Sequence, residues 1–135
     1  MEQNKAVYRE FIQRVFNEGH LDMLDKFLAP SYVIRDAPPG TPPGAEGVKQ
    51  VVSMFREAFP DFEITLDEVI AEGDFVAASS TVRGTHRGEI FGIPATGNRV
   101  SISSLTMVRI IDGRLVESRV KNDTAALMSQ LGSAR

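Results

Sequence analysis

The chain has 135 residues, and its 42% hydrophobic and 24% charged content is typical of a globular protein that forms one domain over residues 1–135. The net charge of −3 provides no basic surface for nucleic acid, and no run of lysines or arginines compensates locally. The absence of cysteine excludes disulfides, thiolate metal sites and cysteine nucleophiles. With only His20 and His86 as imidazoles, a metal site built from several histidines is not expected.

The first sixty residues have helical periodicity. A first helix that ends at Gly19 is predicted from apolar residues on one face, namely Val7, Tyr8, Phe11, Ile12, Val15 and Phe16. A second short helix should present Leu21, Leu24, Phe27 and Leu28 on one side and end at Pro30. Residues 31–36 predict a short strand, and the proline-rich residues 37–44 a stiff connector. A third helix is indicated by Val48, Val51, Val52, Phe55 and Phe59, and it should end at Pro60.

After Pro60 the periodicity changes from helix to strand. Residues 62–67 alternate apolar and polar side chains, and β-rich runs follow at 75–86, 100–111 and 114–121. The Asp-Gly pair between the last two runs is typical of a tight hairpin, and residues 124–132 predict a short final helix. This order predicts an α+β fold with a cone-shaped, curved antiparallel sheet, helices on its concave face and an enclosed small-molecule pocket.

Several segments resemble the SnoaL-like polyketide cyclases. They are EAFPDF at 57–62, EVIAEGDFVAA at 68–78, GTHRGEIFGIPATG at 84–97, RIIDGRLVE at 109–117 and the ending from 123 to 132. That family belongs to the nuclear transport factor two-like superfamily, whose cystatin-like α+β cone agrees with the predicted order. Its named members close the last ring of aromatic polyketides by an intramolecular aldol reaction without a metal or organic cofactor. The resemblance therefore implies a cofactor-free cyclase or isomerase.

The resemblance assigns the catalytic roles to Asp123 and His86. The family's catalytic aspartate falls on Asp123, and the histidine of its G-x-H segment falls on His86. An acid/base role requires Asp123 to be desolvated inside the cone, whereas the alternative is an N-cap of the last helix, where the helix end stabilises the carboxylate. For His86, orientation of the substrate or proton exchange stands beside a half-exposed histidine at a strand end.

Candidate substrate contacts come from strands and from the third helix. A glutamine and a histidine of the cyclase pocket fall on Ser104 and Thr106, and Arg119 stands in place of a tryptophan. An inward Arg119 would hold a carboxylate or enolate oxygen, and an outward one would be solvated or lie in an interface. Phe59 and Phe62 are candidates to line an aromatic-binding pocket, although at their spacing the hydrophobic core is the commoner role.

Two alternatives remain beside a cyclase, isomerase or lyase acting on a hydrophobic, polyketide-like carbonyl compound. One is a non-catalytic protein that binds a small hydrophobic molecule. The other is an epoxide hydrolase-like enzyme of the same superfamily, for which Asp36, Glu117 and Arg119 are loose candidates. No nucleic-acid or membrane partner is expected.

The sequence also favours a cytoplasmic homodimer. The first residues mix both charge signs and lack an apolar signal core, which indicates a cytoplasmic protein. Val82, Leu105 and Met107 are predicted to lie on the outer face of the sheet and to make it apolar in places. The resemblance, in a family whose members pair through the sheet, implies that this face joins two copies.

Overall fold

The computed structural model describes residues 2–35, 37 and 39–132. The first half of the described chain is mostly helical: α1 (Glu2–Phe11), the π-helix η1 (Ile12–Asn17), the 3-10 helix η2 (Leu21–Met23), α2 (Leu24–Phe27), β1 (Leu28–Ile34) and α3 (Ala45–Ala58). The second half is mostly strand: β2 (Glu63–Glu72), β3 (Phe75–Thr85), β4 (Arg99–Ile111), β5 (Arg114–Asn122) and the final helix α4 (Thr124–Gln130). The predicted α+β order is confirmed.

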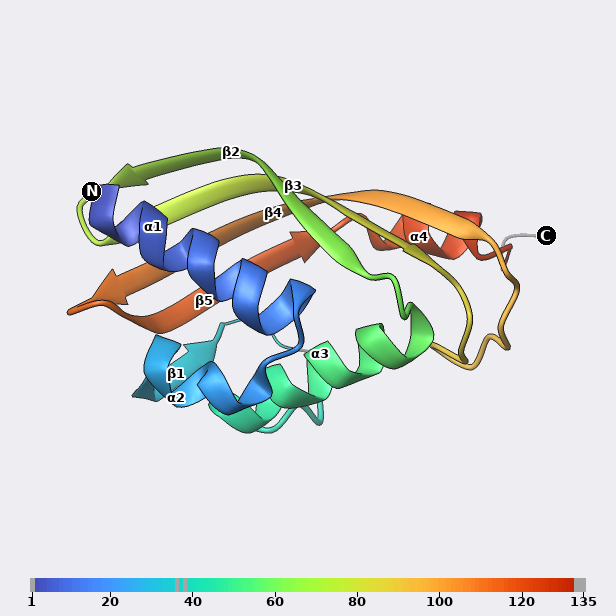
Figure 1. Ribbon diagram of the computed structural model, residues 1–135, viewed down its shortest axis with the longest axis horizontal. Helices are drawn as coiled ribbons and strands as arrows, with labels where there is room; N and C mark the ends of the chain where they lie inside the picture. Colours follow the sequence, from blue (N-terminus) through green and yellow to red (C-terminus); the bar gives the residue numbers. More distant parts are fainter. Residues whose placement is uncertain (1, 36, 38, 133–135) are drawn as a thin grey trace.

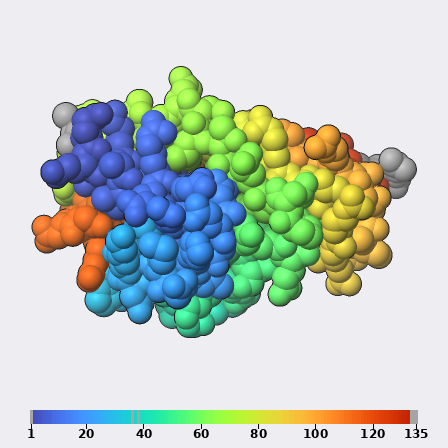
Figure 2. All heavy atoms as spheres, in the orientation of Figure 1, coloured from blue at the N-terminus to red at the C-terminus, as the bar shows by residue number. Residues whose placement is uncertain are grey.

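The strands form one sheet in the order β1-β5-β4-β3-β2. Strands β2 to β5 pair antiparallel, as predicted, and β1 adds a parallel strand beside β5. Helices α1, α2 and α3 lie together on one side of the curved sheet, and α4 lies at the end opposite the N-terminus (Figure 1). Figure 2 shows that the first three helices form a continuous cover over much of that side.

The hairpin between β4 and β5 forms as the Asp-Gly pair predicted. Asp112 and Gly113 both have positive φ, 52° and 77°, which is the conformation of a type I′ turn. This turn suits the right-handed twist of the two strands, so it fixes their register locally.

The boundary between α2 and β1 differs from the prediction. Leu28 and Pro30 belong to β1, and Leu28 pairs with Leu115 of β5 instead of ending a helix. Because β1 lies at the edge of the sheet, a proline there removes no essential hydrogen bond of the strand ladder. Periodicity alone had assigned Leu28 to the helical face. Asp36, at the end of the predicted strand, lies outside the described residues.

The helices and the sheet bury two apolar clusters. The first cluster lies under α1, α2 and the first half of α3, and its sheet members are Leu28, Tyr32, Val76, Ala78, Val108, Ile110 and Leu115. The second cluster lies at the other end of the sheet and contains Ala58, Phe59, Phe62, Ile90, Val100, Ile102, Leu127 and Leu131. Helix α4 therefore closes the second cluster with its apolar face, as the two leucines of the ending show.

Asp61 joins the α3–β2 turn to the end of β3. Its Oδ1 accepts the Thr85 backbone N–H and its Oδ2 accepts the Thr85 hydroxyl, both at 2.7 Å. These two bonds, the backbone bond most of all, hold the pKa of Asp61 below its ordinary value. The α3–β2 turn is thereby held against the end of β3, next to His86, which follows Thr85 in the chain.

We predict that Asp61→Ala lowers the free energy of unfolding by about 1 kcal/mol at pH 7, because two hydrogen bonds to an exposed carboxylate are lost. A carboxyl whose pKa is depressed by folding stabilises the protein above its unfolded pKa of about 4. That stabilisation disappears as the pH falls through the folded pKa. Urea unfolding at pH 7 and in acid should therefore show a difference between wild type and variant that shrinks in acid.

Asp61→Asn is the matched control for this prediction. Its amide oxygen still accepts the Thr85 N–H, so part of the stability remains, but the contribution no longer depends on protonation. A difference between wild type and Asp61→Ala that stays constant from neutral to acid pH would contradict the assignment.

Candidate functional site

Polar side chains interrupt the apolar inward face of β3 and β4. Every second residue of β4 is turned inward, in the order Val100, Ile102, Ser104, Thr106, Val108 and Ile110. On β3 the register places Ser80 opposite Ser104 and Ala78 opposite Thr106. Ser80, Ser104 and Thr106, here called the hydroxyl band, therefore lie between the two apolar clusters. The band is the most polar part of an otherwise apolar concave face.

The hydroxyl band is hydrogen-bonded within the sheet. The Ser80 hydroxyl donates to the backbone oxygen of Ser104 at 3.4 Å, and the Ser104 hydroxyl donates to Oδ1 of Asn122 at 2.7 Å. Ser80 and Ser104 are only 5% and 6% exposed. Because a buried hydroxyl without a partner is costly, these bonds explain how the sheet tolerates two serines in its interior.

Two buried tyrosines bring phenol hydroxyls to the same face. Tyr8 of α1 is hydrogen-bonded to the Thr106 side chain; burial raises the pKa of Tyr8 to about 12, while this hydrogen bond opposes the rise. Tyr32 of β1 donates to the Ser118 hydroxyl at 2.8 Å, and burial raises its pKa also. Both phenols therefore stay neutral at physiological pH and act as fixed hydrogen-bonding groups.

The band reaches solvent at the edge of β5. The register places Val120 opposite Thr106 and Asn122 opposite Ser104, so both side chains belong to the concave face. Val120 is nevertheless 36% exposed, and Asn122 is exposed as well. The described part of β1 pairs with β5 only as far as Ser118. The hydroxyl band therefore ends at exposed residues of β5.

Asp123 follows Asn122 directly, at the start of α4. Its Oδ1 accepts the backbone N–H of Ala126 at 3.0 Å, which makes it the N-cap of the helix. The side chain is exposed, so the desolvated environment that the sequence argument required for an acid/base role is not present. The capping alternative describes this conformation, and the catalytic assignment of Asp123 stays a prediction.

His86 is fully buried at the end of β3, so the expectation of a half-exposed histidine was wrong. Its Nδ1 lies 3.2 Å from the Thr96 backbone N–H, which donates to it, and 3.0 Å from the Thr96 hydroxyl. A backbone N–H can only donate, so Nδ1 is the acceptor and the ring proton lies on Nε2. Within the described residues Nε2 has no hydrogen-bond partner.

The His86 ring packs against Phe59, with ring centroids 5.6 Å apart. Gly84 permits this approach of α3 to β3, because a Cβ at that position would lie 2.7 Å from the Cβ of Phe59. Phe59 and Phe62 are themselves 2% and 6% exposed and line a crevice of about 10 Å³, enough for one water molecule. They lie in the core, and the enclosed pocket predicted from the sequence stays a prediction.

Arg119 does not reach the hydroxyl band. It lies opposite Met107 on the outer face of the sheet and is exposed, because the inward positions of β5 are taken by Ser118 and Val120. Glu117 also lies on that face and pairs with Arg35 at 2.5 Å, which lowers its pKa.

Val82 was assigned to the wrong face. It pairs with Ile102, packs against the second cluster and lines the crevice on the concave side. Its position in the strand has the parity of Ser80, which is turned inward, so the register places it away from the outer face. Leu105 and Met107 do lie on the outer face, where they are 62% and 39% exposed.

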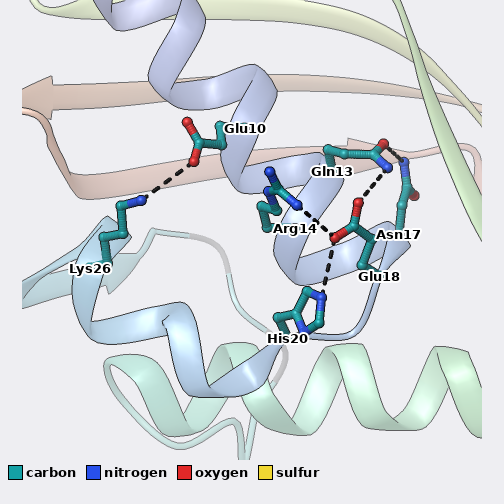
Figure 3. Close-up of polar contacts among 7 residues, drawn as sticks. All are labelled: Glu10, Gln13, Arg14, Asn17, Glu18, His20 and Lys26. Carbon is teal, nitrogen blue, oxygen red and sulfur yellow. Dashed lines mark hydrogen bonds and ion pairs between the residues drawn. The ribbon is translucent and has the colours of Figure 1, made fainter.

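The second histidine lies in a surface cluster away from the band. Figure 3 shows His20 beside Glu18, which also contacts Gln13 and Arg14 of the first helical segment. The His20 Nε2 lies 3.2 Å from a Glu18 oxygen, and hydrogen bonding to Gln13, followed by Arg14, lowers the pKa of Glu18. Among the described residues, no three histidine, aspartate or glutamate side chains form a group that would hold a metal ion.

A larger hollow of about 250 Å³ lies next to this surface, lined by Gly19, Leu21, Val52, Ser53, Arg56 and Glu57. The guanidinium of Arg56 donates to the backbone oxygens of Phe16 and Asn17, at 3.0 and 2.8 Å. Arg56 thus fastens the end of the first helical segment to α3, and the hollow lacks the convergent hydroxyls of the concave face.

Residues 6–131 match the family model of the SnoaL-like polyketide cyclases. The chain belongs to this family. It is 32% identical over 120 residues to nogalonic acid methyl ester cyclase of Streptomyces nogalater, with 87% of this chain and 89% of that protein covered. Among solved structures it resembles TsrD from Streptomyces laurentii, with a TM-score of 0.88, 30% identity and coverage of 98% and 96%. It also resembles IdmH from Streptomyces antibioticus, with a TM-score of 0.84, 36% identity and coverage of 96% and 99%.

Membership of the SnoaL-like family agrees with the resemblance on which the site residues were assigned, but their individual roles stay predictions. Sequence reasoning missed Ser80, Tyr8, Tyr32 and Asn122. The alternation of side chains along β3 could have identified Ser80, because Ser80 has to share one face of the strand with Val76 and Val82. Within the described residues no helix is long and apolar enough to cross a membrane, and the cytoplasmic location stays a prediction.

We predict that His86 is neutral with its proton on Nε2 in the folded protein. Two-bond ¹H–¹⁵N spectra of the imidazole should show an unprotonated Nδ1, because the Thr96 amide donates to it. Thr96→Val should keep this tautomer while lowering the free energy of unfolding by about 1 kcal/mol, since the hydroxyl bonds to Nδ1 and to the Asn98 amide are lost. A proton on Nδ1 in the wild type would contradict the assignment.

Proposed function

We propose that the protein is a cofactor-free cyclase that closes a ring in a polyketide-like carbonyl compound by an intramolecular aldol reaction. The observation that best supports this is the hydroxyl band, which lies between two apolar clusters and ends at Asn122, the exposed residue before Asp123. Apolar surface on both sides suits the rings of a polyketide, and the hydroxyls suit its oxygens. Because the hydroxyl band ends beside Asp123, where the family has its catalytic aspartate, a substrate bound along the band lies next to the proposed base.

The reaction needs one group that first takes and then returns a proton. The Asp123 carboxylate removes a proton from the carbon next to a carbonyl, and the electron pair of that C–H bond forms an enolate. The enolate carbon attacks a second carbonyl carbon of the same molecule, so a carbon–carbon bond forms and the carbonyl π bond becomes an alkoxide. The protonated Asp123 then protonates the alkoxide. The product is an isomer of the substrate, so no oxidant, reductant or co-reactant is required.

The exposed position of Asp123 is compatible with this role. The Ala126 N–H binds one oxygen of the carboxylate, and the other oxygen is left to act as the base. Bound substrate at the open edge of β5 removes water from the carboxylate, which strengthens its basicity when the C–H bond is in place. Desolvation then comes from the substrate and not from the folded chain alone.

The nogalonic acid methyl ester cyclase gives the first substrate to test, because this chain is 32% identical to it. In the proposal, Thr106 contacts a substrate oxygen, and Ser104 acts through Asn122, to which its hydroxyl donates. His86 packs against Phe59 and contributes to the structure around the site and not to proton transfer, since Nε2, which has no partner among the described residues, carries the ring proton.

The epoxide hydrolase-like alternative has less support. It needs a second carboxylate beside Asp123, yet Glu117 is paired with Arg35 on the outer face and Asp36 lies outside the described residues. The non-catalytic alternative differs from the cyclase in one respect only, which is whether a bound compound is converted.

We predict that the wild type converts nogalonic acid methyl ester and that Asp123→Asn lowers kcat by a factor of about 100 or more, because the carboxylate base is lost. Asparagine is a good N-cap, so the free energy of unfolding should change by less than about 0.5 kcal/mol. Conversion is followed by chromatography of the cyclised product, and stability by urea unfolding.

Asp22→Asn is the matched control, since it removes an exposed carboxylate in a short helix far along the chain from the band. It should leave kcat unchanged. Equal turnover by the wild type and Asp123→Asn would refute the role of Asp123. Binding of the ester without conversion by the wild type would favour the non-catalytic alternative.

The homodimer is also part of the proposal. The outer face of the sheet presents Ile70, Leu105 and Met107, of which the first two are 68% and 62% exposed. An apolar sheet face of this kind is uncommon in a monomer and suits pairing with a second copy. Its charged residues lie around the apolar centre, as in the rim of an interface.

We predict that the protein sediments as a dimer at micromolar concentration and that Leu105→Lys shifts it to monomer without loss of the fold. The reason is that a lysine at the centre of the paired face would be buried without a partner. Asp22→Lys, an exposed change on the helical side, should leave the dimer intact. A wild type that sediments as a monomer would contradict the proposal.

A further inference from the structure

Asn122 is the residue of the concave face whose side chain is both held by the hydroxyl band and open to solvent. The Ser104 hydroxyl donates to its Oδ1 at 2.7 Å, and Ser104 is only 6% exposed. Because the carboxamide is planar, fixing its oxygen against Ser104 turns the Nδ2 amine to the other side. The amine is thus an oriented donor on a residue that is exposed at the edge of the sheet.

The aldol reaction needs a hydrogen-bond donor next to the base, where Asn122 lies. Removal of a proton by Asp123 puts negative charge on the oxygen of the neighbouring carbonyl, and a donor aimed at that oxygen stabilises the enolate. Asn122 directly precedes Asp123, and its exposed carboxamide ends the row of inward side chains from Leu66 through Ser80 and Ser104. The Ser104 hydroxyl is itself committed to Asn122, so it acts through the amide.

We propose that Nδ2 of Asn122 donates a hydrogen bond to the substrate oxygen that becomes the enolate, and that Ser104 is the positioning residue that aims it. This inference rests on the proposed aldol function. It also narrows the substrate class: the carbonyl that enolises lies at the exposed end of the bound molecule, next to Asp123, and the remaining rings extend along the band towards Tyr8 and Thr106. A neutral amide suits a carbonyl or quinone oxygen better than a carboxylate.

The test compares four variants, with Ser104→Thr as a fifth that restores the hydroxyl, in two assays. Asn122→Leu removes the donor, Asn122→Asp keeps an acceptor for Ser104 but removes the donor, and Ser104→Ala removes the positioning hydroxyl. Ser103→Ala is the matched control, because Ser103 lies beside Ser104 in the chain but is exposed on the outer face. The first assay is conversion of nogalonic acid methyl ester. The second is binding of 1,8-dihydroxyanthraquinone, a planar probe with a ring carbonyl that cannot undergo the ring closure.

We expect both Asn122 variants to lose about 100-fold in kcat with a smaller change in KM, since the bond strengthens as charge develops. Asn122→Leu should weaken probe binding about tenfold. Probe binding should shift the side-chain amide resonances of Asn122 in ¹H–¹⁵N spectra of the wild type. Ser104→Ala should lower kcat about tenfold and broaden those resonances, and Ser104→Thr, which retains the hydroxyl, should restore both.

The possible results separate the inference from the function on which it rests. Conversion with kcat unaffected by Asn122→Leu, or saturating probe binding that leaves the Asn122 amide resonances unmoved, overturns the inference while the cyclase stands. Probe binding that depends on Asn122 without any conversion supports the donor and refutes the cyclase for this ester. A wild type that neither converts the ester nor binds the probe overturns both. Thermal unfolding of each folded variant separates these effects from loss of structure.

Discussion

Along β3 and β4 the inward side chains change from apolar to hydroxyl and back to apolar, and the arrangement of the helices follows from this change. A buried hydroxyl without a partner costs about 1–3 kcal/mol, so each one in the band needs a hydrogen bond. Ser80 and Ser104 find theirs within the sheet and at Asn122, whereas Thr106 is bonded by Tyr8 of α1. The first helix is therefore located by a polar contact as well as by its apolar face. The two clusters lie on either side of the band, and Phe16 and Ile64 pack against both.

The ending that resembles the family, residues 123–132, is fastened to one end of this sheet by side-chain hydrogen bonds. Gln130 donates to the backbone oxygen of Ser101 at 2.9 Å and accepts the Ser101 N–H at 2.7 Å, so its side chain pairs with β4 like a short strand. Asn98 adds a bond from its amide to the Gln130 backbone oxygen at 3.1 Å. Together with the His86–Thr96 contact, these bonds hold α4 and the loop before β4 over the second cluster. The start of α4 is thereby fixed beside the hydroxyl band.

The alternation of apolar and polar residues and the residues typical of turns were sufficient to predict the antiparallel sheet. Strands of nine residues or more repeat this alternation often enough to be unambiguous. These patterns failed at Leu28, where a four-residue helix meets an edge strand and each pattern is too short to decide. The alternation of side chains predicted faces where the register was known, but Val82 was assigned to the wrong face, and for Arg119 the outward alternative is the one observed. Parity within one strand does not say which face is inward until the buried partners across the sheet are known. The roles of Tyr8 and Asn122 depend on contacts between distant segments, which no local pattern contains.

Asp123 can cap α4 and also act as the base, because the two roles use different oxygens of its carboxylate. The cap engages Oδ1 through the Ala126 N–H, and proton abstraction needs a lone pair of only one carboxylate oxygen. The bond from the Ala126 N–H holds the carboxylate in place at the start of α4. Holding the carboxylate still also lowers the entropy lost when substrate, base and amide donor come together. The cap and the catalytic role were treated as alternatives in the sequence analysis. In the proposal, the Asp123 side chain serves both.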